Sequence, residues 1–413
     1  MAMNIMYINN VVIPDARANQ ASGIGRVTGQ ISEYLASQFQ DTIYAGYFFD
    51  SPEKGAPHLS DHIQLALPDS QSNDDQPFEQ FLDDHSIDII QVNVSDDQLV
   101  HHIPTICNIA HRHNVKVVYC IHFMPGYEGV SFGSPNEVWY CLTHKKPFLN
   151  KLKKWFISFN RPLSTKVIWH LLKAKYKNVY DSCDKIVVFS DPYVDQYLNI
   201  VKGHRRDQFT VIPNPLTFNE FLPVDNMVSK KKEVLMVGRM QQSQKRVSIA
   251  LKIWKKIEKN PLLADWTLTL VGNGPDEEYL HWLAEKYQLK RVRFEGRQDP
   301  KPYYERSAIF ISTAGYEGWP MVLMEAMPMG CCCLSFDSYD AIHDIIKDGH
   351  NGRIIPNNDI KRYTKALMEL MLDNEKRSEI GIHAIKSSCQ FAMEKIGEQW
   401  HRLFEELVAK PGV

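Results

Sequence analysis

Two glutamates stand in a segment of the chain that could bind a sugar or a ribose. The segment Glu317-Gly-Trp-Pro-Met-Val-Leu-Met-Glu325 follows an apolar run at 309–312, and Pro320 fits the first turn of a helix. We expect Glu317 in the loop at the carboxyl end of a strand and Glu325 on the next helix. Carboxylates accept hydrogen bonds from hydroxyls, and a helix N-terminus favours a bound anion. The alternative is a capped surface helix with ordinary acidic residues, because this spacing is common.

Two basic residues follow an earlier apolar run, 234–237. Gly238 would let the backbone turn tightly at the end of that strand, and Arg239 and Lys245 come after it. Two cations could neutralise a diphosphate and stabilise it as a leaving group. The alternative is a pair of surface bases at a helix start, although Lys245 would then oppose the helix dipole without a bound anion.

The first half of the chain carries two weaker signals. Gly23 and Gly25 lie in the segment 22–26, where glycines would let backbone N–H groups approach a phosphate or sugar. The segment is not a complete dinucleotide-binding fingerprint, and a plain turn explains it equally well. His122 ends the apolar run 115–121 and could contact a transferred sugar or an acceptor hydroxyl, with a structural role as the alternative.

Short apolar runs alternate with helical patterns from end to end and must position these residues. The runs that predict strands are 4–10, 42–48, 87–92, 115–121, 185–189, 209–212, 234–237, 267–271, 291–294, 309–312 and 331–336. Several are rich in β-branched residues and almost continuously apolar, as are strands buried on both faces of a parallel sheet. Helical patterns such as 247–258, 277–287 and 360–372 lie between them. This alternation predicts doubly wound α/β domains.

A chain of 413 residues is long enough for two domains. The proline-containing and polar stretch 213–232 marks the boundary. We expect a Rossmann-like domain at 1–215, a second Rossmann-like domain at 216–390, and a helix at 391–413 that packs back on the first domain. Ligands of such sheets bind beyond the carboxyl ends of the strands, so the two domains should face each other across a cleft that holds the site.

Composition narrows the class of protein. The formal net charge of −2 argues against bulk nucleic-acid binding, and no long apolar run or signal peptide is visible. Cys331, Cys332 and Cys333 would point to alternating faces of a strand, so we interpret them as core thiols rather than metal ligands. Reduced thiols fit a cytoplasmic location.

One basic segment, 144–178, breaks the alternating pattern. It contains ten Lys or Arg, no Asp or Glu, and interleaved aromatic residues. Such a helical insertion could lie on an anionic membrane surface and place the protein peripherally on the inner face of the plasma membrane. A helix pair that only covers the first domain is the alternative, and RNA binding is disfavoured because no nucleic-acid module surrounds the segment.

Taken together, the motifs resemble those of the retaining glycosyltransferases of the GT-B fold, family four, also called glycosyl transferases group 1. The resemblance is strong over 232–356 and patchy in the first half. In chain order it rests on GIGRV at 23–27, the strand end at His122, VVFS at 187–190, PNP at 213–215, VGRM…QKR at 237–246, VGNGP at 271–275, FEGR at 294–297, EGWPMVLMEAMPMG at 317–330 and DIIKDGHNGRIIP at 344–356.

The resemblance implies that the domain at 1–215 binds the acceptor and that the domain at 216–390 binds the nucleotide sugar. It also implies roles for residues of this chain. Arg239 and Lys245 would hold the diphosphate, Glu317 the donor sugar and Glu325 the ribose, while His122 would contact the sugar or the acceptor. Further contacts to the nucleotide sugar would come from Gly23, Gly25, Gly238, Arg297, Gly318, Trp319, Pro320, Met321 and Val322. Trp319 replaces the commoner Phe of the family, and Pro328 predicts that the helix with Glu325 ends early.

The expected function is transfer of a hexose or N-acetylhexosamine, with retention, from a nucleotide sugar to a glycan or lipid-linked acceptor in surface-polysaccharide synthesis. The wording of the 317–330 motif resembles members that use UDP-sugars. We expect no cofactor and no metal requirement, because no convincing DxD motif is present. The alternatives are a UDP-sugar epimerase or hydrolase of the same fold, or a non-catalytic nucleotide-sugar-binding protein.

Overall fold

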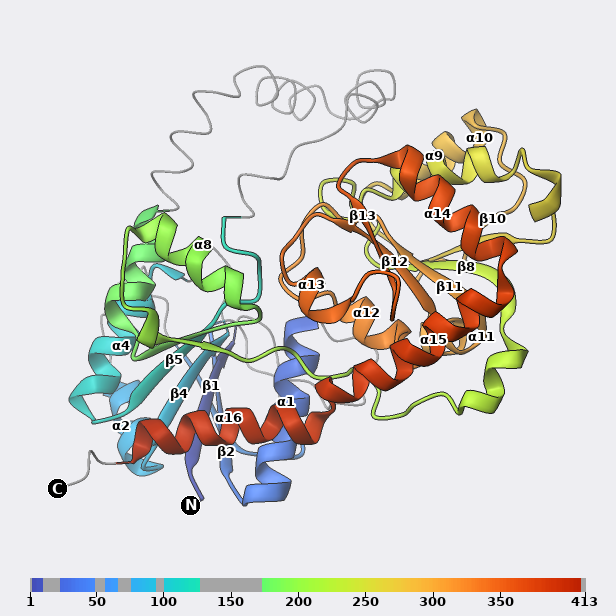
Figure 1. The fold of residues 1–413 in the computed structure, drawn as a ribbon. Helices are drawn as coiled ribbons and strands as arrows, with labels where there is room; N and C mark the ends of the chain where they lie inside the picture. Colours follow the sequence, from blue (N-terminus) through green and yellow to red (C-terminus); the bar gives the residue numbers. More distant parts are fainter. Residues whose placement is uncertain are drawn as a thin grey trace. The chain divides into compact units, whose positions relative to one another are not determined.

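The computed structural model describes residues 2–9, 23–48, 56–65, 76–93, 100–126 and 173–409. These residues divide into two compact α/β units, drawn in Figure 1. The first unit contains the described residues up to Gly126, then 173–215 and 391–409, and the second contains 216–390. Most of the predicted basic insertion lies outside the described residues, and its last residues, 173–178, belong to a helical stretch at 173–182.

The first unit is built on a seven-stranded parallel sheet in the order β3-β2-β1-β4-β5-β6-β7. The strands are β1 (Asn4–Asn9), β2 (Thr42–Tyr47), β3 (Leu59–Gln64), β4 (Ile89–Asn93), β5 (Lys116–Cys120), β6 (Lys185–Val188) and β7 (Phe209–Val211). The chain winds away from β1 in one direction through β2 and β3 and in the other through β4 to β7. The switch point of this doubly wound sheet therefore lies between β1 and β4, where such sheets bind ligands.

Helices cover both faces of this sheet (Figure 1). They are α1 (Gly23–Phe39), α2 (Gln76–Asp84), α4 (Ile103–Arg112), α8 (Asp191–Val201) and α16 (Met393–Val408). The C-terminal α16 packs along α1, where a side chain at Gly397 would meet the ring of Tyr34 at 2.1 Å. His401 of the same helix stacks on Phe39 with a centroid distance of 3.7 Å. These contacts make the last helix part of the first unit.

The second unit has a six-stranded parallel sheet in the order β10-β9-β8-β11-β12-β13. The strands are β8 (Lys231–Val237), β9 (Thr267–Val271), β10 (Val292–Phe294), β11 (Ser307–Ser312), β12 (Cys332–Asp337) and β13 (Arg353–Pro356). β8, β9, β11 and β12 are buried along most of their length, and their side chains join Trp254, Trp266 and Tyr363 in one apolar core.

Seven helices flank this sheet in the described chain: α9 (Val247–Ile257), α10 (Glu277–Lys286), α11 (Lys301–Arg306), α12 (Met321–Ala326), α13 (Ile342–Ile345), α14 (Ile360–Leu372) and α15 (Asn374–Ser388). Aspartates start the last two: Asp359 accepts a hydrogen bond from the N–H of Arg362 at 2.9 Å, and Asp373 accepts one from Lys376 at 3.0 Å. Such side-chain caps satisfy backbone donors that a helix leaves without an internal partner.

The predicted strands are all present in parallel sheets, so the doubly wound α/β prediction is confirmed. Two edge strands were missed. β3 reads LSDHIQ and is largely accessible, and β13 is short and ends in Pro356. Edge strands bury fewer side chains, so their sequences lack the continuous apolar signal. The prediction that Cys331, Cys332 and Cys333 are core residues is confirmed by their complete burial.

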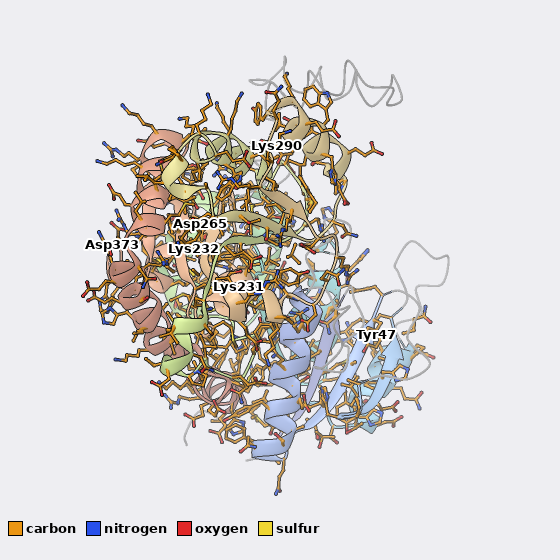
Figure 2. The ribbon with its side chains drawn as sticks, turned by 90° about the vertical axis from the view of Figure 1, so that its right-hand side faces the viewer. Tyr47, Lys231, Lys232, Asp265, Lys290 and Asp373 are labelled. Carbon is orange, nitrogen blue, oxygen red and sulfur yellow. The ribbon has the colours of Figure 1, made fainter. Side chains whose placement is uncertain are left out.

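The amino ends of the second sheet carry an ordinary charged surface. Figure 2 shows Lys232 at the start of β8 near Asp265, which precedes β9, and their Nζ and Oδ2 atoms lie 2.5 Å apart. Both side chains are more than half exposed. None of the helices in the described ranges combines the length and hydropathy that a membrane span requires.

Candidate functional site

A glycine-dependent turn ends β8 at the carboxyl edge of the second sheet. Gly238 has a φ of +148° and donates its N–H to the carbonyl of Val271 at 3.0 Å. Gly272, at the end of the neighbouring strand, has a φ of +130°, and a Cβ there would lie 2.1 Å from the carbonyl oxygen of Gly238. Both positions require glycine, because a side chain would strain the backbone and separate the two strand ends. The tight turn predicted at Gly238 is confirmed.

The turn continues to Arg246, the residue before α9. The carbonyl of Gln241 accepts hydrogen bonds from the N–H groups of Gln244 and Lys245 at 3.3 and 2.8 Å. Arg246 adopts a left-handed conformation with a φ of +50°. This folded turn orients residues 244–246 toward the loop 313–317, which follows β11 on the adjacent strand.

Residues 244–246 bind that loop directly, and we call them the clasp. The carbonyl of Gln244 accepts a hydrogen bond from the N–H of Gly315 at 2.7 Å. A Cβ at Gly315 would approach Nε of Arg246 to 3.2 Å, so the small residue permits the close contact. The loop with Glu317 is therefore positioned by a segment far away in sequence.

Arg246 anchors the clasp by donating to backbone carbonyls. Its Nε binds the carbonyl of Thr313 at 2.8 Å, and its Nη2 binds that of Ala314 at 2.6 Å. Burial lowers the pKa of its guanidinium to about 10, which leaves the group protonated at neutral pH. The guanidinium of Arg246 therefore serves to hold the loop 313–317 in place.

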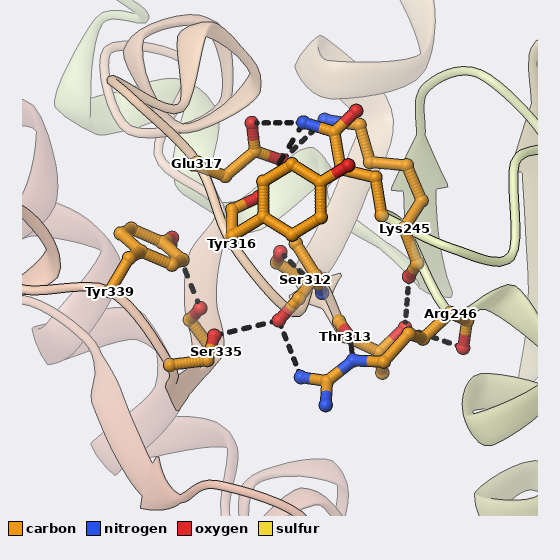
Figure 3. Close-up of polar contacts among 11 residues, drawn as sticks. Lys245, Arg246, Ser312, Thr313, Tyr316, Glu317, Ser335 and Tyr339 are labelled. Carbon is orange, nitrogen blue, oxygen red and sulfur yellow. Dashed lines mark hydrogen bonds and ion pairs between the residues drawn. The ribbon is translucent and has the colours of Figure 1, made fainter. Parts of the chain in front are cut away.

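Lys245 and Glu317 form an ion pair at the centre of this arrangement (Figure 3). Nζ of Lys245 lies 2.5 Å from Oε1 of Glu317, and the side chains are 16% and 8% exposed. The other carboxylate oxygen, Oε2, accepts a hydrogen bond from Nε2 of Gln244 at 3.1 Å. The structure thus brings together two residues that the family resemblance assigns to the diphosphate and the sugar of one ligand. Their limited exposure strengthens the electrostatic interaction relative to a surface pair.

Glu325 is buried on α12, next to a tyrosine. The hydroxyl of Tyr304 donates to Oε2 of Glu325 at 2.8 Å. Burial raises the pKa of Tyr304 well above its usual range, and the nearby carboxylate adds to the effect, so the hydroxyl keeps its proton. The helix ends at Ala326, as Pro328 predicted.

The other residues predicted to contact the nucleotide sugar are distributed along the same edge. Gly318, Trp319 and Pro320 are buried in the loop before α12, and Met321 and Val322 are half-buried in its first turn. Arg297 is exposed shortly after β10. Arg239 is exposed too, and the described residues offer its side chain no hydrogen bond or ion pair. The structure thus joins Lys245 to Glu317, and it joins Glu325 to Tyr304.

His122 lies at the carboxyl end of β5 in the first unit. Its Nε2 is 3.1 Å from Oδ1 of Asn93, which also accepts from Nε2 of Gln91 at 3.0 Å. Because an amide oxygen only accepts, Nε2 of His122 carries the proton and Nδ1 is left as an acceptor. Burial lowers the pKa of the ring to about 4, although the residue stays partly accessible. His122 is therefore a neutral imidazole at pH 7.

Gly23 and Gly25 are in the first turn of α1, and the expectation that they form a loop is wrong for these two positions. The described helix begins at Gly23, and Gly25 is buried in it. The first-turn N–H groups of a helix have no acceptor within the helix, so this position remains compatible with a bound phosphate.

Sequence reasoning overlooked Gln244, Arg246, Tyr304 and Asn93. Gln244 and Arg246 flank Lys245, and Asn93 is a buried polar residue at a strand end, so these three had a local signal. Nothing in the sequence around Tyr304 indicates that it would reach Glu325. Within the described ranges, no group of three or more His, Cys, Asp or Glu side chains is arranged to hold a metal ion.

Comparison with known proteins matches the second unit to a sequence family. Residues 218–387 match the family model "Glycosyl transferases group 1". The chain is 27% identical over 242 residues to a Campylobacter jejuni protein named GalNAc-alpha-(1->4)-GalNAc-alpha-(1->3)-diNAcBac-PP-undecaprenol alpha-1,4-N-acetyl-D-galactosaminyltransferase, covering 58% of this chain and 64% of that protein. It is 26% identical over 206 residues to the Escherichia coli UDP-Gal:alpha-D-GlcNAc-diphosphoundecaprenol alpha-1,3-galactosyltransferase, covering 46% of this chain and 49% of that one.

The similarity of structure extends over both units. Anabaena HepE, solved in complex with UDP, superposes with a TM-score of 0.71 at 16% identity, covering 98% of this chain and all of that one. By sequence, the chain spans only about half to two thirds of the two transferases above. Residues 218–387 thus match the glycosyl transferases group 1 model, and the whole chain has the GT-B fold of two Rossmann-like domains.

Proposed function

We propose that this protein is a retaining glycosyltransferase that moves a hexose or N-acetylhexosamine from a UDP-sugar to a glycan or lipid-linked acceptor. The observation that carries the proposal is the ion pair of Lys245 and Glu317 at the carboxyl edge of the second sheet. Such an edge is where doubly wound sheets bind ligands. The match of 218–387 to a glycosyltransferase family supports the reaction class.

The pair supplies the two kinds of group that a nucleotide sugar needs. An ammonium has three N–H donors, so Lys245 can keep its contact with Glu317 and still donate to a phosphate oxygen. The carboxylate of Glu317 has lone pairs left to accept from a sugar hydroxyl. The exposed Arg239, which follows the same strand β8, would supply a second positive charge to the diphosphate.

The proposal gives roles to three further residues, Glu325, His122 and Gly238. Glu325, oriented by Tyr304, would accept from the ribose hydroxyls. Neutral His122, with Nε2–H bound by Asn93, would offer Nδ1 as an acceptor to a hydroxyl of the transferred sugar or of the acceptor. Gly238 leaves room for the diphosphate beside the backbone.

The proposed chemistry is a front-side displacement. The bond between the anomeric carbon and the diphosphate oxygen breaks, and the acceptor oxygen bonds to the same face of that carbon. The acceptor proton passes to the leaving phosphate. Lys245 and Arg239 would stabilise the charge that develops on the diphosphate, so the reaction should proceed without a divalent ion.

The assay starts with a panel of nucleotide sugars tested for thermal stabilisation. A ligand present at a hundred times its dissociation constant stabilises the folded state by about 2.7 kcal/mol. The best sugar donor is then incubated with lipid-linked and glycan acceptors, with and without EDTA, and the anomeric configuration of the product is determined by NMR. Inversion, or loss of activity in EDTA, would overturn the mechanism.

Two control incubations separate the competing activities. Turnover of the sugar donor without any acceptor would indicate an epimerase or hydrolase, and binding without turnover by any acceptor would indicate a non-catalytic binding protein. Sedimentation with vesicles containing anionic lipid tests the proposed peripheral membrane location.

A further inference from the structure

The two carboxylate oxygens of Glu317 are held by neighbouring residues of one turn. Oε1 binds the ammonium of Lys245 at 2.5 Å, and Oε2 accepts from Nε2 of Gln244 at 3.1 Å. A carboxylate held through one oxygen can rotate about the last bond of its side chain. A second contact at the other oxygen removes that rotation and fixes which lone pairs remain accessible.

The Gln244 side chain is itself set by its surroundings. The backbone carbonyl of Gln244 accepts a hydrogen bond from the N–H of Gly315 at 2.7 Å, so the backbone that carries this side chain is tied to the loop with Glu317. Its amide nitrogen also lies 3.5 Å from the carbonyl of Tyr316. Both groups facing this nitrogen are acceptors, and an amide NH₂ with two donors is the group that satisfies them.

The charge of this second group matters as well as its position. Lys245 already balances the charge of Glu317, and a second cation would compete with Lys245 for the carboxylate. A second carboxylate would repel Glu317 and attract the ammonium. A neutral amide fixes the geometry and leaves the positive charge of Lys245 available to an anionic ligand. Tyr339 is a titratable group close to Glu317; burial, and after it the charge of Glu317, raises the pKa of Tyr339, so its hydroxyl stays neutral.

We propose that Gln244 is a positioning residue, whose side-chain amide holds Glu317 in the one orientation that can accept a hydrogen bond from the sugar of the donor. This inference rests on the proposed function. Gln244 acts through Glu317 and needs no contact with the substrate. The inference predicts that replacing the side-chain amide of Gln244 lowers kcat more than it lowers the affinity for the nucleotide.

The test compares three variants with the wild type in the full chain. Gln244→Leu removes the hydrogen-bond donor at nearly constant size. Gln244→Glu keeps the size and places a negative charge beside Oε2. Gln241→Glu adds the same charge in the same turn and serves as the matched control, because within the described residues the Gln241 side chain forms no hydrogen bond with Glu317. UDP binding is measured by calorimetry, and kcat and KM with the best sugar donor are measured from pH 5 to 9.

Gln244→Leu should bind UDP like the wild type and lose about tenfold to a hundredfold in kcat, the range for a hydrogen bond to a charged group. Gln244→Glu should lose at least as much in kcat, because a second carboxylate would repel Glu317 and attract the ammonium of Lys245. Gln241→Glu should keep kcat close to that of the wild type. Melting temperatures identify any variant that is merely misfolded.

The outcomes separate this inference from the proposed function. If the wild type neither binds UDP nor turns over any nucleotide sugar, the proposed function fails first. If the wild type is active and Gln244→Leu keeps its kcat, or if Gln241→Glu lowers kcat as far as Gln244→Glu does, Gln244 has no positioning role.

Discussion

Nζ of Lys245 lies 2.5 Å from Oε1 of Glu317, although the two residues are 72 positions apart in the sequence. The pair forms because β8 and β11 are adjacent parallel strands, whose carboxyl ends bring the following loops together. Removing two such charges from water costs free energy. Replacing one partner of the pair strongly destabilises the folded state, because the other partner is left as an unpaired buried charge. We propose that this pair serves to bind the nucleotide sugar.

Lys245→Met and Glu317→Gln should each lower kcat/KM by about a hundredfold or more, because each removes a group that would contact the diphosphate or the sugar. The double variant should lose much less than the product of the two single losses, since the side chains act together. Steady-state kinetics of the four proteins in a double-mutant cycle measures this coupling.

The exposed pair Lys232–Asp265 provides the control, because it has the same 2.5 Å separation at the opposite edge of the sheet. Lys232→Met and Asp265→Asn should leave kcat/KM unchanged and alter the free energy of unfolding by no more than about 1 kcal/mol. Full additivity of the Lys245 and Glu317 losses would show that the two groups work independently.

Tyr304→Phe should lower the free energy of unfolding by about 1–3 kcal/mol, because buried Glu325 loses a hydrogen-bond donor. Chemical denaturation measures this loss, and calorimetry should show weaker UDP binding. Tyr303→Phe is the matched control, since Tyr303 donates to Glu295 at 3.2 Å in a more accessible setting. Equal losses in the two variants would argue against a special role for the Tyr304–Glu325 contact.

The ring of His122 should make the folded state less stable as the pH falls below neutrality. Its pKa is lowered to about 4 by burial, whereas the unfolded chain binds the proton near the ordinary value of about 6.5. The unfolded state therefore binds more protons between these values, and stability falls with pH through that window. Relative to His122→Gln, the wild type should lose about 1–2 kcal/mol between pH 7 and pH 5.

Denaturant titrations of both proteins at several pH values provide the comparison. Asn93→Asp offers an independent check, since a carboxylate at the position of Oδ1 should raise the pKa of His122, as followed by NMR of the ring. A stability difference that stays constant between pH 5 and pH 7 would contradict the assignment of a buried, neutral ring.

Gly272→Ala should destabilise the second unit by more than the ordinary cost of a left-handed residue, which is about 1–2 kcal/mol. The added methyl would lie 2.1 Å from the carbonyl of Gly238, so the turn before Lys245 must shift and UDP binding should weaken. Gly296→Ala is the control, because Gly296 has a φ of +66° with no atom near the position of a Cβ. The melting temperature of Gly272→Ala should be lower than that of Gly296→Ala. The reverse order would show that Gly272 does not lie so close to the carbonyl of Gly238.

The architecture of the protein was readable from local patterns. Strands buried in a parallel sheet are almost continuously apolar, and each apolar run of this kind in the sequence forms a strand in the structure. The sequence did not predict the polar strand β3 or the strand β13, which ends in a proline, because strands at the edge of a sheet bury fewer side chains. The turn at Gly238 and the early end of α12 could also be predicted from the sequence, because glycine and proline constrain the backbone at their own positions.

Only the tertiary structure decided which side chains meet. The sequence by itself determined that Lys245 and Glu317 follow strands, and the strand order made β8 and β11 neighbours. Gln244 and Tyr304 gained their partners from side-chain directions set by packing across distant segments, which no local pattern encodes. Local propensity depends on neighbours in the chain, whereas the geometry of a polar site depends on neighbours in space.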